Sequence, residues 1–312
     1  METLAVVLEE PLRVSLRPLE LKAAGADDVV VQVDWSGIST GTERLLWSGK
    51  MPPFPGMGYP LVPGYESVGR IVEAGASARH RLGETVFVPG SSAFIGAHGL
   101  FGGAARTLVT ASTRACAISS ELAERGILIA LAATARHALA SGDGRAPDLI
   151  VGHGVLGRLL ARIALAEGRP APTVWEVQAA RRAGAKGYEV IDPSDDPRRD
   201  YQSIYDASGA HDLLRTLISK LGRGGEVVLA GFYDKPLSFD FPPAFMREAR
   251  IRIAAEWQPG DLTAVLRLID QGLLSLDDLI THQAEPQAAN DAYARAFTDQ
   301  ACLKMVLDWR QT

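Results

Sequence analysis

The feature that most constrains the fold of this chain is the segment DLIVGHGVLGRLLARIALAEG, in which a short apolar run passes into a helical pattern through glycines spaced G-x-G-x-x-G. The first glycine permits a tight turn, the second lets backbone N–H groups approach a pyrophosphate, and the third lets the helix pack closely on the strand. We therefore expect a bound dinucleotide to contact Gly152, Gly154, Val155, Leu156 and Gly157.

An acidic residue on the following strand-like run, TVWEV, bears on which dinucleotide binds. Glu176 lies 24 residues after Gly152, close to the spacing expected of the acid that binds the adenosine ribose hydroxyls. A carboxylate there accepts hydrogen bonds from ribose but repels a ribose phosphate. Arg181 and Arg182 act in the opposite direction, because arginine can bind a phosphate. The balance of charge favours NAD over NADP, with Glu176 and Arg181 near the cofactor.

From residue 129 onward, strand-like segments alternate with helical ones. The strand-like segments are DLIVG, TVWEV, GYEVID, SIYDASG, EVVLAG and RIRIAAE. This alternation predicts an α/β fold with a doubly wound parallel sheet over residues 129–258. Residues 1–128 instead show short β-branched runs with Gly and Pro breaks, which predicts a β-rich domain. The run ACLKMVLDW near the C-terminus is strand-like, and we expect residues 259–312 to complete the first domain.

Charge and cysteine content exclude several classes of partner and location. The net charge of −5 and the pI of about 5.7 provide no basic field to attract nucleic acid. Cys116 and Cys302 form no C-x-x-C pair, which argues against a disulfide framework. The start METLAVVLEEPLRV lacks the pattern of a signal peptide, and no apolar run reaches the roughly 20 residues of a membrane span. We expect a cytoplasmic protein without an integral membrane segment, and leave open a transient association with a membrane surface.

Several motifs together resemble the medium-chain dehydrogenase/reductase superfamily: SGISTGTE, PGYESVGRIVEAG, ATARHAL and DASGAHDLLRTLISKLGRGGEVVLAGF. The resemblance covers nearly the whole chain. It implies a GroES-like catalytic domain beside a Rossmann domain, oxidation of an alcohol by NAD, cofactor contacts from Ser208 and Gly231, and a homodimer joined through the nucleotide-domain sheet. The string SGKMPPFPGMGYPLVPGYESVGR is similar to members of the superfamily that act on tetrapyrroles, which implies oxidation of a ring hydroxyethyl group to acetyl in bacteriochlorophyll synthesis.

The resemblance also implies that the catalytic zinc of many relatives is missing. Ser39 matches the cysteine ligand, Tyr65 the histidine ligand, and Ala130 the position of a third ligand. A catalytic zinc needs three protein ligands, and a hydroxyl, a phenol and a methyl group form a poor set. We therefore expect no metal at this site.

Without zinc, a side chain must accept the proton of the alcohol. The candidates are the hydroxyls of Ser39 and Thr42, with Tyr65 and Glu66 as alternatives, and Glu43 on the same predicted wall. The competing interpretation is a strand-to-helix turn in which Ser39 or Thr42 caps the helix ERLLWSG.

A large apolar substrate would need a wall of broad side chains. Aromatic and methionine residues gather in the loop SGKMPPFPGMGYP and near it, and a histidine lies in a later glycine-rich loop. The candidate substrate contacts are Trp47, Met51, Phe54, Met57, Tyr59 and His98. Packing of the β-rich domain would explain the aromatic and methionine residues equally well. Of the other histidines, we expect His137 to be packed and hydrogen-bonded, and His153 to face solvent.

Two rival functions fit the same motifs. One is a zinc-free reductase of an enone or quinone, against which the hydroxyl-rich ISTGTE loop argues. The other is a nucleotide-responsive protein that binds pigment without converting it. That protein would bind NAD and show no change in nicotinamide absorbance when the alcohol is supplied.

Overall fold

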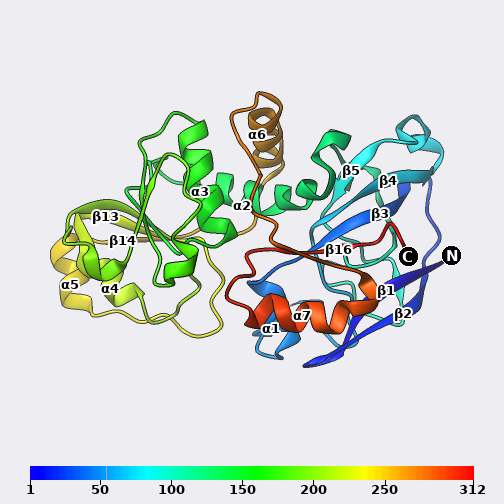
Figure 1. Cartoon of the computed structure of the whole chain (residues 1–312), viewed down its shortest axis with the longest axis horizontal. Coiled ribbons are helices and arrows are strands. Elements are labelled where there is room, and N and C mark those ends of the chain that lie inside the picture. The colour runs from blue at the N-terminus through cyan, green and yellow to red at the C-terminus, as the bar shows by residue number, and fades with distance from the viewer. Residues whose placement is uncertain (54) are drawn as a thin grey trace. The chain divides into compact units, whose positions relative to one another are not determined.

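The chain forms two compact units in the computed structural model, which describes residues 1–53 and 55–312 (Figure 1). Unit 1 comprises Met1–Ala130 and Asp277–Thr312, and unit 2 comprises Leu131–Leu276. The first boundary differs by two residues from the expected 128/129, whereas the second lies well beyond the expected 258/259.

The second boundary moves because helix α6 (Pro259–Asp270) belongs with unit 2. Asp261 in its first turn lies 2.9 Å from Nδ1 of His137 on helix α2 (Ile129–Ala140). The same carboxylate also pairs with Arg136 of α2 at 3.7 Å. His137 is thus packed and hydrogen-bonded, as the sequence predicted. A helical pattern alone does not show which of two domains a terminal helix joins.

Unit 2 is built on a six-stranded sheet with the order β11-β10-β9-β12-β13-β14, in which every neighbouring pair is parallel. This is the strand order of a dinucleotide-binding doubly wound sheet, with its switch point between β9 and β12. The predicted fold class is therefore confirmed. The strands are β9 (Leu149–Val151), β10 (Thr173–Trp175), β11 (Glu189–Ile191), β12 (Tyr201–Asp206), β13 (Leu221–Leu229) and β14 (Arg250–Ile253).

The helices of unit 2 follow from the apolar spacing. In α3 (Val155–Ala166), Leu159, Leu160 and Ile163 are fully buried, while Gly154 caps its N-terminus. The remaining helices are α4 (Leu214–Lys220), α5 (Phe241–Arg247), and two short 3₁₀ turns, η4 (Ala179–Arg181) and η5 (Pro193–Asp195).

Unit 1 is β-rich, as predicted, and contains two sheets. The larger runs β15-β16-β3-β4-β5-β8, with β7 also paired to β3, and the smaller runs β1-β2-β6. The C-terminal strand β16 pairs antiparallel with β3, so that Met305 faces Ile38, and Figure 1 shows the two strands side by side. The predicted return of the C-terminus is confirmed. The strands are β1 (Glu2–Glu10), β2 (Arg13–Leu21), β3 (Asp28–Ile38), β4 (Ser67–Ala74), β5 (Thr85–Val88), β6 (Phe94–Ile95), β7 (Thr107–Ala111), β8 (Cys116–Ala117), β15 (His282–Ala284) and β16 (Met305–Asp308).

Helices are few in unit 1. They are α1 (Thr42–Trp47), α7 (Ala289–Thr298) and the 3₁₀ segments η1 (Ala76–Arg81), η2 (Ser112–Arg114), η3 (Ser120–Leu128) and η6 (Pro286–Ala288). The segment η3 does not continue helix α2 as one α-helix, because Ala123 has φ +47° and only the part from Ile129 onward is α-helical.

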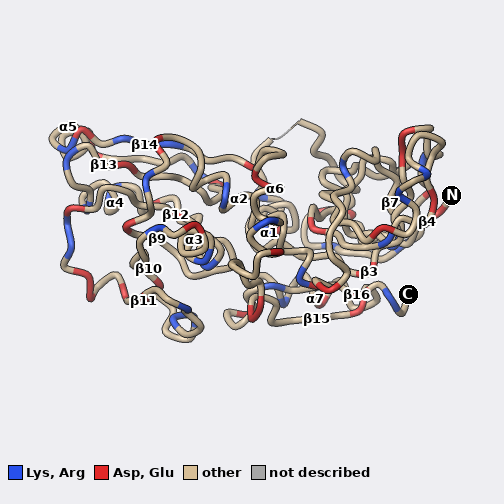
Figure 2. The backbone as a smooth tube through the Cα atoms, turned by 90° about the horizontal axis from the view of Figure 1, so that it is seen from above, with Lys and Arg blue, Asp and Glu red and all other residues tan. Residues whose placement is uncertain are grey.

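Charged residues of both signs intermingle along the backbone of each unit (Figure 2). This agrees with the small net charge of the chain. Among residues 1–53 and 55–312, no helix has the length and apolar character that a membrane crossing requires.

Candidate active site

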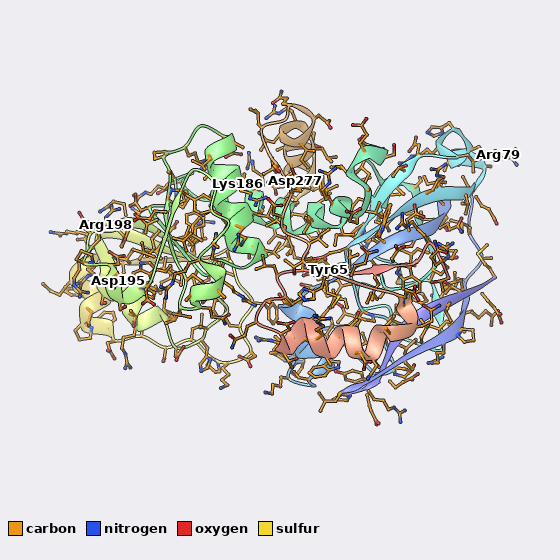
Figure 3. All side chains as sticks on the ribbon, viewed as in Figure 1. Tyr65, Arg79, Lys186, Asp195, Arg198 and Asp277 are labelled. Atoms are coloured by element: carbon orange, nitrogen blue, oxygen red, sulfur yellow. The ribbon has the colours of Figure 1, made fainter. Side chains whose placement is uncertain are left out.

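Three of the predicted catalytic hydroxyls meet in unit 1. Ser39 follows β3, and Thr42 begins α1. Tyr65 precedes β4 and is labelled in Figure 3. The Ser39 Oγ lies 2.5 Å from the Tyr65 hydroxyl oxygen, and Thr42 Oγ1 donates to the same oxygen at 3.3 Å. We call Ser39, Thr42 and Tyr65 the hydroxyl cluster. Gly41 is the N-cap of α1 and no side chain caps the helix, so the helix-cap interpretation of Ser39 and Thr42 is wrong.

The backbone before Tyr65 explains why it reaches this position. Gly64 has φ +92°, a conformation that glycine adopts without a steric cost, and a Cβ there would lie 3.1 Å from the backbone nitrogen of Ala104. The Tyr65 ring then packs edge-on against Phe101, with 5.1 Å between ring centroids. Burial, together with the negative charge of Glu66, raises the pKa of Tyr65 well above that of an ordinary tyrosine. Tyr65 is therefore a neutral phenol that can pass a proton along.

A buried carboxylate, that of Glu43, binds the backbone of the hydroxyl cluster. Glu43 is fully buried, and its Oε1 accepts a hydrogen bond from the Ser39 backbone nitrogen at 2.9 Å. Its Oε2 accepts one from the hydroxyl of Tyr293, on α7, at 2.9 Å. Burial raises the pKa of Glu43 to about 7, and the nearby charge of Glu66 adds to the effect. No local pattern in the sequence indicates Tyr293, which lies 250 residues from Glu43 along the chain.

The other predicted acid, Glu66, is committed to an ion pair. Its Oε2 contacts Nζ of Lys304, and both side chains are almost completely buried. A Cβ at Gly37 would lie 2.2 Å from that oxygen, so only glycine fits opposite it. Burial raises the pKa of Glu66, and Lys304 opposes that shift. In the described residues no hydrogen bond joins Glu66 to the hydroxyl cluster. Lys304 lies inside the apolar run ACLKMVLDW, and a lysine in such a run could have indicated a buried partner for an acid.

The resemblance matches Ser39, Tyr65 and Ala130 to the zinc ligands of relatives, and the absence of zinc from this site stays a prediction. Ser39 and Tyr65 are hydrogen-bonded to each other, and Ala130 presents only a buried methyl group. Within the part of the chain that the structure describes, no three His, Cys, Asp or Glu side chains are placed to hold an ion. The donors present thus do not suit zinc.

The glycine turn in unit 2 fits a pyrophosphate. Gly152 has φ +96°, and a Cβ on Gly157 would lie 1.9 Å from the Gly152 carbonyl oxygen, which shows how closely the helix approaches the strand. A Cβ on Gly154 would meet no protein atom within 4 Å. The turn is therefore open at Gly154, at the N-terminus of the 12-residue helix α3, where N–H groups and the helix dipole favour an anion.

Glu176 lies at this turn, as the spacing predicted. Its Oε2 accepts a hydrogen bond from the His153 backbone nitrogen at 3.0 Å, and its Oε1 accepts one from the Gln178 nitrogen at 2.8 Å. Glu176 as a whole is 7% exposed. It thus ties the end of β10 to the glycine turn, and its contact with ribose stays a prediction.

The expectation that His153 faces solvent is wrong. Its side chain is fully buried, with Nδ1 2.7 Å from the carbonyl oxygen of Arg181 and Nε2 2.9 Å from the hydroxyl of Tyr188. Burial lowers the pKa of His153 to about 4, so the ring is neutral at pH 7. Arg158 donates to the same carbonyl at 3.0 Å. The segment after Glu176 folds over the ring, which a local pattern does not show.

The other two predicted cofactor residues lie after neighbouring strands of the same sheet. Ser208 donates from its nitrogen and its Oγ to Oδ1 of the buried Asp206, at 2.9 and 2.6 Å. A Cβ on Gly231 would lie 3.0 Å from the Gly209 nitrogen. Both residues follow the carboxyl ends of β12 and β13, the edge of a doubly wound sheet at which ligands bind.

The residues predicted to form a substrate wall pack on the core of unit 1. Met51 is buried, while Trp47, Met57 and Tyr59 are partly buried against that core, and the Tyr59 hydroxyl donates to the Leu46 carbonyl. These side chains therefore pack on the core of unit 1, and their contact with a substrate stays a prediction. Of the other two predicted substrate contacts, His98 is exposed, and Phe54 lies outside the described residues.

Comparisons with known proteins agree with the fold of the two units. The alcohol dehydrogenase GroES-like domain matches residues 25–121. The 2-desacetyl-2-hydroxyethyl bacteriochlorophyllide A dehydrogenase of Rhodobacter capsulatus is 58% identical over 99% of both chains, and that of Cereibacter sphaeroides is 56% identical over the full length of both. A solved alcohol dehydrogenase from Escherichia coli CFT073, in complex with NADH, superposes with a TM-score of 0.83 at 22% identity over 98% of this chain and 99% of that one.

Proposed function

The chain belongs to the medium-chain dehydrogenase/reductase superfamily and, within it, to the family of 2-desacetyl-2-hydroxyethyl bacteriochlorophyllide A dehydrogenases, and on this premise we propose that it oxidises the hydroxyethyl group of a bacteriochlorophyllide to acetyl with NAD and without catalytic zinc. The chain is an oxidoreductase that acts on a CH–OH group. Identity of 56–58% over whole chains to two relatives of that name is the observation that carries the substrate assignment.

The reaction must remove a hydride and a proton from the secondary alcohol. When bound, the nicotinamide dinucleotide supplies the hydride acceptor. The hydride leaves the carbinol carbon, the O–H proton passes to the protein, and a ketone remains. The proposed first acceptor is the oxygen of Ser39 or Thr42, which releases its own hydroxyl proton to the Tyr65 oxygen, within 3.3 Å of both. The half-buried Tyr65 releases its own proton in turn to solvent water.

Glu43 is proposed to hold this relay in place. Its bond to the Ser39 backbone nitrogen fixes the turn between β3 and α1, and Tyr293 fixes the carboxylate from the other side. Because the pKa of Glu43 is about 7, its charge state changes near neutral pH and alters the field at the cluster.

A nicotinamide cofactor is supported by the glycine turn and the family. The preference for NAD over NADP is a proposal based on Glu176, whose buried carboxylate at the turn would repel a ribose phosphate. The test is the ratio of kcat/KM for NAD to that for NADP, which should exceed 10 in the wild type and fall in Glu176→Gln, because the amide removes the repelling charge.

We also propose a homodimer joined through unit 2. Strand β14 is the last strand of its sheet, and Ile253 on it is 76% exposed. Phe241, Phe245 and Met246 on α5 are 66–72% exposed. An edge strand beside exposed apolar side chains suits pairing with a second copy. Sedimentation should give twice the 33.3 kDa chain mass, and Ile253→Lys should give the monomer mass.

The direct test of the function is an anaerobic assay with a hydroxyethyl bacteriochlorophyllide and NAD, in which pigment and nicotinamide absorbance are followed together. The proposal expects one NADH for each pigment converted. Pigment binding without NADH would indicate a carrier, and turnover of enones or quinones alone would indicate a reductase. The cytoplasmic location stays a prediction.

A further inference from the structure

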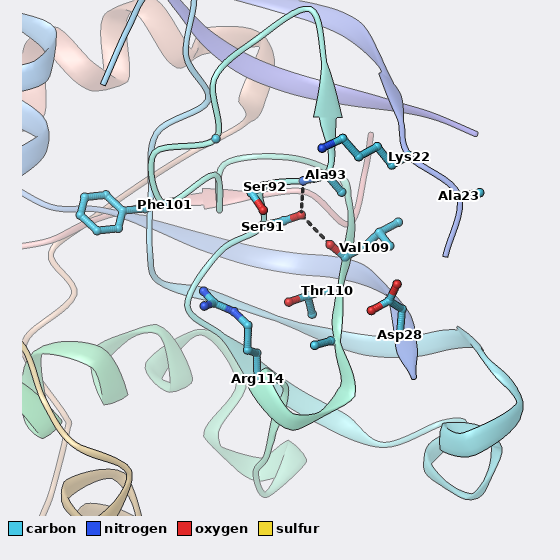
Figure 4. A pocket seen from close by; sticks show the side chains of 12 residues that line it. Lys22, Ala23, Asp28, Ser91, Ser92, Ala93, Phe101, Val109, Thr110 and Arg114 are labelled. Carbon is cyan, nitrogen blue, oxygen red and sulfur yellow. Dashed lines mark hydrogen bonds between the residues drawn. The ribbon is translucent and has the colours of Figure 1, made fainter. Parts of the chain in front are cut away.

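A pocket of about 490 Å³ opens in unit 1, between the end of β2, the start of β3, the glycine-rich loop before β7, and β7 itself (Figure 4). Its size lies within the range of pockets that take small molecules or parts of larger ones. None of the residues that line it belongs to the hydroxyl cluster or to the substrate wall predicted from the sequence.

The pocket carries an excess of positive charge and free hydrogen-bond donors. Figure 4 shows Lys22 and Arg114 on opposite sides, with Ser92 and Thr110 between them. Among the described residues, neither cation forms a side-chain hydrogen bond or ion pair, and neither hydroxyl has a hydrogen-bond partner. The one acid, Asp28, already accepts a hydrogen bond from the Gly25 nitrogen at 2.8 Å. Two unpaired cations facing two free hydroxyls suit a carboxylate or another small anion.

The loop that bounds the pocket also contacts the hydroxyl cluster. Phe101 lines the pocket, while its ring points away from it in Figure 4 and packs edge-on against Tyr65. Phe101 has φ +68°, in the left-handed region that an aromatic residue seldom adopts. Such backbone conformations persist where the surroundings enforce them, commonly at functional sites. One residue thus links the pocket to the proton relay.

We propose that this pocket binds the free carboxylate of the pigment, with Lys22 and Arg114 as the cations that hold it. The inference rests on the proposed function, since a chlorophyllide, unlike a chlorophyll, is not esterified and carries a free propionate. Anchoring the carboxylate beside the loop that carries Phe101 would orient the macrocycle relative to Tyr65. The pocket would therefore select chlorophyllides over their esters.

The test compares the hydroxyethyl pigment as the free acid and as its methyl ester. In the wild type the acid should show a KM about tenfold lower than the ester, at similar kcat, because only the acid carries the charge. Lys22→Ala with Arg114→Ala should raise the KM of the acid to that of the ester and leave the ester unchanged. The matched control is Arg13→Ala with Arg79→Ala, which removes two exposed arginines of unit 1 and should keep the wild-type contrast (Figure 3).

The outcomes separate the two proposals. Equal KM values for acid and ester in an active wild type would overturn the pocket assignment alone, as would a contrast that survives in the double variant. Inhibition by inorganic phosphate without any contrast between acid and ester would assign the pocket to a free anion and also overturn the proposal. If the wild type converts neither pigment, the proposed function itself fails and the pocket assignment fails with it.

Discussion

The two predicted functional regions of this protein are built in opposite ways. The nucleotide turn of unit 2 depends on backbone geometry, set by Gly152, Gly154 and Gly157 within six residues. The hydroxyl cluster of unit 1 depends on side chains from distant parts of the chain, with Tyr65 26 residues after Ser39. We expect the glycine turn to lose cofactor binding when a single methyl group is added. We expect the hydroxyl cluster to lose only part of the activity when one side chain is changed.

The largest expected effect on function is that of Gly157→Ala. Its new Cβ would lie 1.9 Å from the Gly152 carbonyl oxygen. Because the clash is with a backbone atom, no side-chain rotation can relieve it, and α3 must move away from the strand. We expect dinucleotide binding to be lost and the stability to fall by about 1–3 kcal/mol. Nucleotide titration by fluorescence and thermal unfolding measure the two effects.

Gly154→Ala is the matched variant in the same turn. Its Cβ meets no protein atom within 4 Å, so the thermal midpoint should stay near that of the wild type while dinucleotide affinity falls. Unchanged affinity in Gly154→Ala would show that the pyrophosphate does not bind at this glycine.

The next effect concerns the buried ion pair of unit 1. Lys304→Met leaves the Glu66 carboxylate buried without a partner, and we expect a loss of about 3–5 kcal/mol of unfolding free energy. Adding Glu66→Gln should restore most of that loss, because no isolated charge remains. Chemical denaturation of the single and double variants decides the matter, and a double variant as unstable as the single one would argue against this account.

Tyr65→Phe should act on catalysis and hardly on folding. Removing the hydroxyl separates Ser39 from Thr42, and we expect kcat to fall by about 100-fold with the thermal midpoint nearly unchanged. Tyr205→Phe, which removes the hydroxyl that donates to the Arg145 carbonyl in unit 2, should leave kcat unaltered. A Tyr65→Phe enzyme with wild-type kcat would remove Tyr65 from the relay.

The last effect, confined to a narrow pH range, is a pH dependence of stability from Glu43. Its pKa rises from 4.5 to about 7 on folding, so between these values the folded state holds a proton that the unfolded state has lost. The contribution of Glu43 to stability therefore falls as the pH rises through this window, by roughly 1.4 kcal/mol per pH unit. Denaturation from pH 5 to 7 should show this slope in the wild type relative to Glu43→Gln. Parallel curves would contradict it.

The same contrast explains what the sequence could predict. The glycine spacing, the strand after it and Glu176 are local features, and the parallel sheet follows from the alternation of strands and helices. Side-chain meetings across the chain have no such local signature. Tyr293 and Lys304 join Glu43 and Glu66 only because α7 and β16 return to unit 1, and His153 is buried because Tyr188 folds over it.

The most direct test of the central claim, that hydroxyls carry the alcohol proton away without help from a catalytic metal, is the specific activity of the purified enzyme measured against its zinc content before and after exhaustive chelation. The account predicts full turnover of the hydroxyethyl pigment with far less than one zinc per chain, and no gain when zinc is added back. Activity that falls in proportion to the zinc removed, and returns with zinc, would contradict it.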